Sequence, residues 1–240
     1  MTIHVKRVTL NHDKYPTKKH YPFVLPIFNQ TKHLNLESPT TIFVGENGTG
    51  KSTLLEAIAH AADIHIWQDT GGRRYQVNFY EKELYKCISL DWSNGKTTGS
   101  FFGSEVFHDF TQILEEWAVS DPGQLNYWGG KSLITQSHGQ GIMSYFKARY
   151  KIRGLYLLDE PETALSPKSQ LEFLEIIKEN SQAGHAQFII ATHSPILLAC
   201  PGAKIFSFDH SPVSTISYEE TQHYQIYKGF LTNPKNYLQD

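Results

Sequence analysis

Apolar and polar residues follow a regular pattern along most of the chain, and this pattern predicts five strands. Residues 3–10 alternate between apolar and polar, which is typical of a strand with one buried face. Four other segments are short apolar runs whose length suits a buried strand better than a helix. These runs lie at 40–45, 154–161, 186–195 and 204–209.

Apolar residues spaced three and four positions apart predict helices. The expected helices begin at Lys51 and cover 106–119, 141–150 and 166–184. The last of these starts with a serine cap and a proline in its first turn, and a glycine ends it. The tail from Ser217 is polar and aromatic and is expected to be helical in part.

The middle of the chain, 69–103, has a different composition. It is rich in Gly, Thr, Asn and Tyr, with strand-like patches at 75–80 and 86–92, so we expect antiparallel strands and loops there. The segment that follows the first strand is expected to be a loop as far as about Phe28. Elsewhere apolar strands alternate with helices, which predicts an α/β fold with a mostly parallel sheet flanked by helices.

The overall composition is that of an ordinary globular protein. Of the 240 residues, 40% are hydrophobic and 19% are charged, and a chain of this length can bury a large core without a disulfide or a structural metal. The net charge of −2 argues against binding to nucleic acid through bulk positive charge. Nucleic acid stays possible through a local patch, for which the basic loop 71–74 is a candidate, although a solvated turn is the simpler interpretation.

The cysteines and the apolar runs bear on the compartment. Cys87 and Cys200 are isolated, which favours a reducing compartment with two free thiols. The N-terminal segment lacks the apolar core of a secretion signal, and the longest apolar runs are too short to span a bilayer. We therefore expect a soluble, cytoplasmic protein. The twelve histidines show no spacing typical of a zinc site.

A glycine-rich motif lies between a predicted strand and a predicted helix. The sequence GENGTGKS, at 45–52, matches the fingerprint G-x-x-x-x-G-K-[ST] in full. Its glycines let backbone N–H groups approach phosphate oxygens, and the helix N-terminus adds positive potential. We expect Lys51 to bridge the β- and γ-phosphates of ATP and Ser52 to coordinate Mg²⁺. The predicted nucleotide-binding residues here are Gly45, Glu46, Asn47, Gly48, Thr49, Gly50, Lys51, Ser52 and Thr53.

Two adjacent acids end the apolar run at 154–161. Asp159 is expected to hold Mg²⁺ at the tip of the sheet, and Glu160 to polarise the attacking water as a general base. A solvated turn is the alternative, but a phosphate loop needs a Mg²⁺ partner. Adjacent acids also favour an ATPase over a kinase, for which the sequence offers no separate acceptor site.

Five elements occur in one order along the chain: GENGTGKS, SHGQG, LYLLDEPE, TALSP and ATHSP. Together they resemble the ATP-binding cassette (ABC) superfamily. The resemblance implies a P-loop NTPase fold of the cassette type in a single domain, 1–240, with an antiparallel β element and a helical signature region within 69–150. The motifs DEPE, ALSP and THSP are most similar to compact cassette ATPases outside transport, relatives of chromosome-maintenance and break-repair ATPases. The tail resembles that of short bacterial ATPases of the AAA type.

The resemblance gives SHGQG the role of the signature motif. In the family this turn reaches across a head-to-tail homodimer and closes the ATP site of the partner. Ser137 would then supply a hydroxyl and Gly139 a backbone N–H, and Gln140 completes the motif. Transporters usually have leucine where Gln136 stands and glycine where His138 stands. The alternative is an ordinary N-terminal cap of a helix.

Two more positions take their roles from the resemblance. His193, in ATHSP, matches the switch histidine, whose imidazole could contact the γ-phosphate and the attacking water. With Lys51 and Glu160 it completes the predicted catalytic set. Ser166 replaces the aspartate that the family often has in the loop between subunits, which puts coupling through that side chain in doubt.

Two family elements have no firm position in this sequence. The glutamine that usually links the Mg²⁺ site to a partner domain could correspond to Glu105 or to Gln112. The aromatic residue that stacks on adenine could be Tyr21 or Phe23, although a role in the core is at least as good an interpretation.

These observations favour an ATPase that acts as an ATP-driven homodimeric switch. Its partner would be another protein or a nucleic acid, in genome maintenance or in defence. The alternative is the ATP-binding subunit of a membrane transporter, against which Gln136 and His138 argue, so a membrane partner is not expected. A third interpretation, a scaffold that binds ATP without turnover, is disfavoured by the intact Lys51, Asp159, Glu160 and His193.

Overall fold

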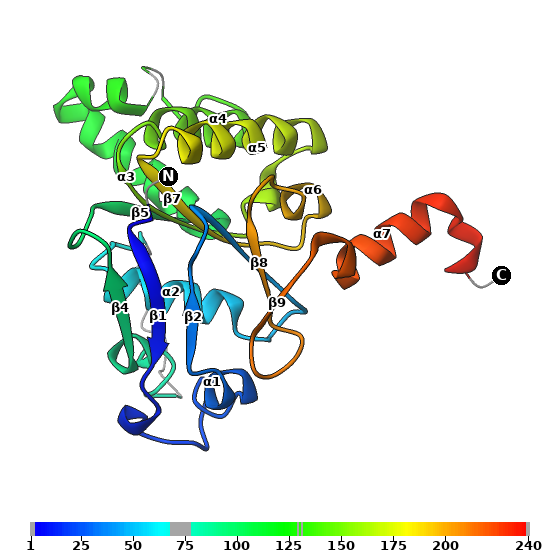
Figure 1. Cartoon of the computed structure of the whole chain (residues 1–240). Helices are drawn as coiled ribbons and strands as arrows, with labels where there is room; N and C mark the ends of the chain where they lie inside the picture. The colour runs from blue at the N-terminus through cyan, green and yellow to red at the C-terminus, as the bar shows by residue number, and fades with distance from the viewer. Residues whose placement is uncertain (1–2, 68–77, 129, 131, 239–240) are drawn as a thin grey trace.

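The computed structural model describes residues 3–67, 78–128, 130 and 132–238. Its main sheet has six strands in the order β5-β6-β7-β3-β8-β9 (Figure 1). The first five strands are parallel, and β9 runs antiparallel to β8 at the edge. The strands are β3 (Thr40–Val44), β5 (Gly99–Gly103), β6 (Gly154–Asp159), β7 (Ala186–Ala191), β8 (Lys204–Ser207) and β9 (Ser214–Ile216).

A second, antiparallel sheet has three strands in the order β2-β1-β4. These strands are β1 (Val5–Leu10), β2 (His33–Asn35) and β4 (Ile88–Trp92). The predicted fold class, with its parallel sheet and its antiparallel element, is therefore confirmed. The expectation that one domain covers residues 1–240 stays a prediction.

Two helices are longer than the apolar spacing predicts, one is slightly shorter, and two short helices were not expected. They are α1 (Pro26–Gln30), α2 (Lys51–Ala61), α3 (Ser104–Ser120), α4 (His138–Arg149), α5 (Pro167–Gln182), α6 (Pro195–Leu198) and α7 (Gln222–Thr232). Short 3-10 helices lie at His12–Lys14, Leu84–Cys87, Pro122–Trp128, Pro161–Ala164, Tyr218–Glu220 and Pro234–Asn236. The predicted helix stop after 166–184 is confirmed, because Gly184 has a positive φ of 79°.

Three sequence predictions for strands and loops are wrong. The segment from the first strand to about Phe28 is not all loop, because α1 begins at Pro26. The prediction of antiparallel pairing throughout 69–103 fails at β5, which pairs in parallel with β6. In the strand-like patch 75–80, residues 75–77 lie outside the described residues, and 78–80 form no strand, since 79 and 80 lie in a turn.

The main sheet separates two hydrophobic cores. Alternate residues of β7 face opposite sides: Ile189 packs in the core that contains α2 and the antiparallel sheet, whereas Phe188 and Ile190 pack in the core with α4 and α5. Figure 1 shows the same arrangement, with α4 and α5 on one face of the sheet and α2 on the other. Because β7 is buried on both faces, its sequence is an unbroken apolar run apart from one residue, Gln187.

Gln187 joins the two sheets inside the protein. Its side-chain Oε1 accepts hydrogen bonds from the backbone N–H groups of His4 and Val5, at 2.8 Å each. Its Nε2 donates to the carbonyl oxygen of Val5 at 2.9 Å. The residue is fully buried, so water cannot replace these three bonds.

The Gln187→Leu variant is expected to lose on the order of 3 kcal/mol of unfolding free energy, because three backbone groups would be left buried without partners. Urea unfolding followed by circular dichroism would measure the change. Gln182→Leu, at the exposed end of α5, serves as the control and should change stability by about 0.5 kcal/mol or less. Equal losses in the two variants would contradict the bridging role of Gln187.

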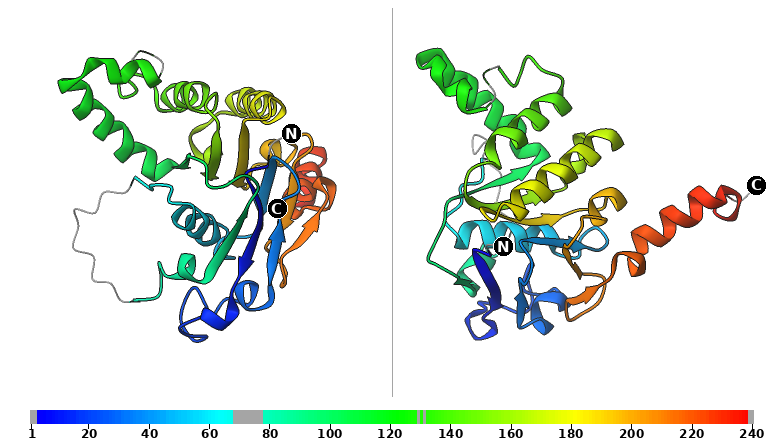
Figure 2. Two further views of the ribbon diagram at one scale, coloured as in Figure 1. Left: turned by 60° about the vertical axis from the view of Figure 1, so that its left-hand side comes forward. Right: turned by 45° about the horizontal axis from the view of Figure 1, so that its top comes forward.

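The C-terminal helix α7 extends away from the rest of the chain (Figure 2). None of its residues is buried, and it exposes the large apolar side chains of Ile226, Tyr227, Phe230 and Leu231. Within the described part of the chain, no helix has both the length and the apolar character needed to cross a membrane. Cys87 and Cys200 are both free thiols and both buried, as their isolation in the sequence predicts.

Candidate functional site

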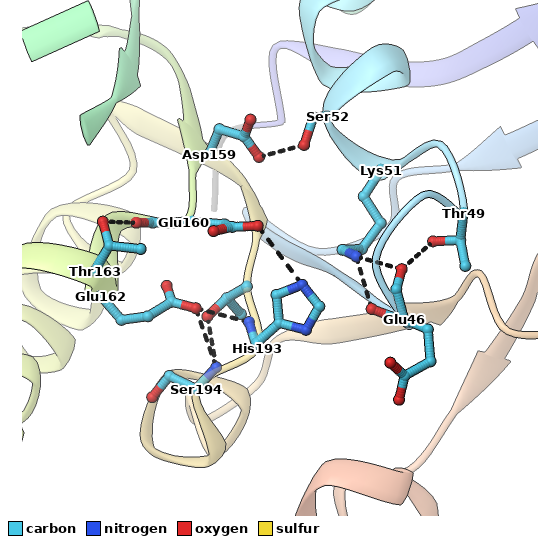
Figure 3. Close-up of polar contacts among 12 residues, drawn as sticks. Glu46, Thr49, Lys51, Ser52, Asp159, Glu160, Glu162, Thr163, His193 and Ser194 are labelled. Atoms are coloured by element: carbon cyan, nitrogen blue, oxygen red, sulfur yellow. Dashed lines mark hydrogen bonds and ion pairs between the residues drawn. The ribbon is translucent and has the colours of Figure 1, made fainter. Parts of the chain in front are cut away.

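The predicted site residues of the phosphate loop, β6 and the ATHSP segment meet at the carboxyl edge of the parallel sheet (Figure 3). Strands β3, β6 and β7 are neighbours, and Asp159 at the end of β6 is in register with Ala191 at the end of β7. Loops that leave this edge carry the phosphate loop, the two adjacent acids and the ATHSP segment (Figure 3). Ligands of open α/β sheets bind at this edge.

The phosphate loop has a backbone that its glycines make possible. Gly50 caps α2 with a left-handed φ of 101°, and a Cβ atom there would lie 2.9 Å from the Phe28 ring. Within the loop, the Thr49 hydroxyl donates to the carbonyl oxygen of Glu46 at 2.9 Å. The backbone N–H of Glu46 donates to Oδ1 of Asp209 at 2.8 Å. Asp209 follows β8 at the same edge, and the sequence analysis gave it no role.

The Lys51 side chain lies inside the phosphate loop. Its Nζ donates to the carbonyl oxygens of Gly45, at 2.6 Å, and Glu46, at 2.9 Å, as Figure 3 shows for Glu46. Burial lowers the pKa of Lys51, while the carboxylates of Glu160 and Asp159 act in the opposite direction. The ammonium group therefore lies where it can meet the oxygens of a phosphate chain held by the loop.

Ser52 and Asp159 form a pair of oxygen ligands. The Ser52 hydroxyl donates to Oδ1 of Asp159 at 2.9 Å. Burial, with a smaller contribution from Glu160, raises the pKa of Asp159 to about 7. A buried carboxylate beside a hydroxyl suits Mg²⁺, which prefers oxygen ligands and would stabilise the charged form of Asp159. Across the described residues, no cluster of three or more His, Cys, Asp or Glu could hold a metal, so Mg²⁺ would take its other ligands from phosphate and water.

Glu160 adopts an unusual backbone conformation. Its φ of 46° and ψ of 54° lie in the left-handed region, which non-glycine residues rarely occupy. The conformation is held by a hydrogen bond from the Glu160 N–H to the carbonyl oxygen of Ala191, at 2.9 Å, and by the Thr163 hydroxyl, which donates to the Glu160 carbonyl oxygen at 3.0 Å. Strain of this kind, about 1–3 kcal/mol, concentrates at functional sites.

The ATHSP segment places His193 beside Glu160. The distance from His193 Nε2 to Glu160 Oε1 is 3.6 Å. Glu162, from the DEPE motif, accepts from the backbone N–H groups of His193, at 2.7 Å, and Ser194, at 3.2 Å. The sequence analysis quoted Glu162 within a motif but missed its role, which is to fix the loop that carries the histidine. Burial, with a contribution from the charge on Lys51, lowers the pKa of His193.

The SHGQG segment caps a helix and is largely exposed. Ser137 is the N-cap of α4, which starts three residues before the predicted position, and the Ser137 N–H donates to Oε1 of Gln140 at 3.3 Å. Ser137 and Gln140 are exposed. A Cβ atom on Gly139 would come within 3.0 Å of the carbonyl oxygen of Ala164, so the turn packs tightly on the TALSP loop. The structure thus shows a capping role for Ser137, and its role toward a second copy stays a prediction.

Two family descriptions match this chain, and between them they cover all five motifs. "AAA domain, putative AbiEii toxin, Type IV TA system" matches residues 134–199. "AAA domain" matches residues 25–63.

Two curated relatives and one solved structure similar to this chain are ATP-binding proteins or an ABC transporter by name. The thiamine import ATP-binding protein ThiQ of Ruegeria sp. is 26% identical over 163 residues, which are 63% of this chain and 69% of the relative. The cytochrome c biogenesis ATP-binding export protein CcmA of Chelativorans sp. is 28% identical over 170 residues, 67% of this chain and 80% of the relative. An inward-facing structure of a metal-chelate type ABC transporter aligns with a TM-score of 0.51 at 18% identity, over 94% of this chain and 88% of that one.

The chain is an ABC-type P-loop ATPase. In this ATPase, Ser166 has a local structural role. Ser166 is the N-cap of α5, and its Oγ accepts from the N–H of Ser169 at 3.2 Å. Gln170, one turn further, donates to the carbonyl oxygen of Leu165 at 3.0 Å and accepts from the hydroxyl of Ser194 at 2.5 Å. The Gln170 side chain therefore links the TALSP loop to the ATHSP loop.

The two candidates for the glutamine of the family occupy different places in the ATPase. Glu105 lies in the first turn of α3, two residues after Gly103, and Gly103 is in register with Asp159. Gln112 lies two turns further along α3, where its Nε2 is 3.0 Å from Nε2 of His108. Proximity to the carboxyl edge of the sheet therefore favours Glu105.

The two candidates for adenine stacking also differ. Phe23 is fully buried in the core, so its ring has no free face for a base, and the prediction is wrong for this residue. Tyr21 is 38% exposed, and its hydroxyl is hydrogen-bonded to Thr53 at the start of α2. Tyr21 is thus the candidate that remains. The basic loop 71–74 lies outside the described residues.

Proposed function

We propose that the ATPase works as an ATP-driven switch, in which two copies associate head to tail around two ATP molecules and separate after hydrolysis. One observation carries the proposal. Lys51, Glu160 and His193 gather at the carboxyl edge of the sheet, while Ser137 at the capped start of α4 is exposed and available to a second copy.

Each residue at the sheet edge has a distinct task in this proposal. The Lys51 ammonium would neutralise the β- and γ-phosphates. Ser52 and Asp159 would hold Mg²⁺, which supplies charge stabilisation to the phosphates when bound. The Glu160 carboxylate would orient the attacking water and accept its proton, and His193 would donate a hydrogen bond to the γ-phosphate.

The second copy would complete the site through the start of α4. A helix N-terminus offers unpaired backbone N–H groups and a positive end of the helix dipole, both of which favour a phosphate. Gly139 has no side chain to hinder such an approach, while Ser137 and Gln140 would add side-chain contacts. Closure would thus depend on ATP, and the dimer would pass its motion to a partner protein or to a nucleic acid, in genome maintenance or in defence.

A second candidate function is the ATP-binding subunit of a membrane transporter. It is favoured by two of the curated relatives, whose names describe thiamine import and export in cytochrome c biogenesis. Affinity purification of a hydrolysis-deficient variant with ATP present would separate the two functions. Recovery of a polytopic membrane protein would support the transporter, whereas recovery of a non-membrane protein or a nucleic acid would support the proposed switch.

Turnover itself is tested by Lys51→Ala, which should reduce phosphate release from ATP by on the order of 100-fold or more, because the charge that faces the transferred phosphate is lost. Purified protein and a colorimetric phosphate assay are sufficient. Lys178→Ala, on the surface of α5 in an ion pair with Glu175, is the matched control and should keep wild-type turnover. Equal phosphate release by both variants would contradict the catalytic role of the phosphate loop.

A further inference from the structure

A second histidine stands behind the switch histidine. Nδ1 of His193 lies 2.9 Å from Nε2 of His223, which is the second residue of α7. The start of this helix is well fixed, because the buried Thr221 caps it by accepting from the N–H of Tyr224 at 3.3 Å. The hydroxyl of Thr221 also donates to the carbonyl oxygen of Tyr218 at 2.7 Å. His223 is therefore held in place by its own helix start.

A single proton must lie between the two rings. Burial lowers the pKa of His193 and that of His223, which favours the neutral form of both imidazoles. A neutral imidazole has one nitrogen that donates and one that accepts. Either His223 Nε2 donates to His193 Nδ1, or the reverse, and the choice fixes the tautomer of both residues.

The outer nitrogen of each ring decides between these two arrangements. His193 Nε2 is buried without a hydrogen-bond partner, and the Glu160 carboxylate, which only accepts, lies 3.6 Å away. If His193 donated through Nδ1, its Nε2 would carry no proton. Its lone pair would then lie opposite the carboxylate oxygen, and two acceptors repel each other. In the same arrangement His223 would carry its proton on Nδ1, which is also buried without a partner, and an unpaired buried N–H is costly.

The opposite arrangement replaces the repulsive contact at His193 Nε2 with an attractive one, because an N–H then faces the Glu160 carboxylate. His223 donates from Nε2 to Nδ1 of His193, and its own Nδ1 is then an unprotonated acceptor. His193 carries its proton on Nε2, which is directed at Glu160 and at the space beside Lys51 (Figure 3). A phosphate oxygen is acceptor-only, so this is the tautomer that can donate to it.

We propose that His223 is a positioning residue for ATP hydrolysis, which holds His193 in the tautomer that donates from Nε2 to the γ-phosphate and to Glu160. The inference rests on the proposed function for its phosphate contact. It also gives α7 a role in the site, since the helix that extends from the body supplies the residue behind the switch histidine.

Two substitutions of His223 separate positioning from packing. His223→Leu removes the donor and should lower kcat about tenfold. The KM for ATP should stay within about twofold of wild type, because the phosphate loop still binds ATP in the same way. His223→Gln can place an amide N–H close to the position of the imidazole Nε2–H and should restore kcat to within about threefold of wild type.

A double-mutant cycle tests whether His223 acts through His193. In the His193→Ala background, His223→Leu should change kcat by less than about twofold. An equal tenfold loss in both backgrounds would overturn the proposal, because it would show that His223 acts by another route. A Gln variant as impaired as the Leu variant would count against it in the same way.

The tautomer of His193 can be measured without an assay of ATP hydrolysis. Nitrogen-15 NMR of the imidazoles at about pH 8, with the His193→Ala spectrum to assign the signals among the twelve histidines, should show His193 protonated at Nε2. A proton on Nδ1 of His193 would overturn the inference. If wild-type protein showed no ATP turnover while the spectrum gave the Nε2–H form, the proposed function would fail and the hydrogen bond from His223 would stand.

Discussion

ATP hydrolysis by the Glu160→Gln variant is expected to fall by on the order of 10²–10⁴-fold, the usual contribution of a general base. Glutamine has the shape of glutamate but cannot accept a proton from the attacking water. The left-handed backbone at residue 160 is equally strained with either side chain, so the fold should not change. ATP binding should be retained, because Lys51 and Ser52 remain in place.

This variant also tests the homodimer. If ATP holds two copies together until it is hydrolysed, Glu160→Gln with ATP and Mg²⁺ should accumulate dimers, which light scattering coupled to size-exclusion chromatography would detect. Glu179→Gln, an exposed glutamate on α5, is the matched control and should hydrolyse ATP at the wild-type rate. Monomers alone, in a Glu160→Gln sample shown to bind ATP, would contradict a site shared between two copies.

The Ser137→Arg variant is expected to bind ATP but to lose the ATP-dependent dimer altogether. Ser137 is exposed in the single chain, so an arginine there should leave the fold and the phosphate loop intact. In the dimer, the larger side chain would have to fit where the start of α4 meets the triphosphate of the other copy, and steric conflict would prevent closure. Combining Ser137→Arg with Glu160→Gln, which should otherwise trap dimers, makes the loss measurable by light scattering.

The control for this variant is Gln182→Arg in the same Glu160→Gln background. Gln182 is exposed at the last turn of α5, which begins at the site edge of the sheet and ends at the opposite edge. An added positive charge there is compatible with the helix C-terminus. The control should dimerise with ATP. Persistence of the dimer in the Ser137→Arg double variant would remove the signature role assigned to SHGQG.

Most of the fold follows from local pattern. The runs that became β3, β6 and β7 are apolar throughout because both faces of the sheet are covered, and each ends at a glycine, an acid or a polar loop. The strand β2, by contrast, has only three residues, too few for a period to be visible. The strand β5 was placed in the antiparallel region because its sequence, GSFFG, carries no information about the direction of its neighbour.

The candidate site was predictable where a motif is continuous in sequence. The residues that the sequence analysis missed all act across long separations. Asp209 holds the phosphate loop from 163 residues away, and His223 reaches His193 across 30 residues. Glu162 is close in sequence to Glu160, but its contact with the backbone of His193 depends on the pairing of β6 with β7. Such contacts depend on the order in which the strands pair, and local patterns in a single sequence do not predict that order.

The hydrogen bond from the Glu160 N–H to Ala191 has a consequence for the durability of the enzyme. The carboxylate stays in position only while β6 and β7 remain paired to their last residues, since the local backbone alone would prefer another conformation. Fraying of the two strand ends would let the peptide before Glu160 rotate, at a cost far below that of opening the cores. On heating, ATP hydrolysis should therefore be lost at a lower temperature than the secondary structure.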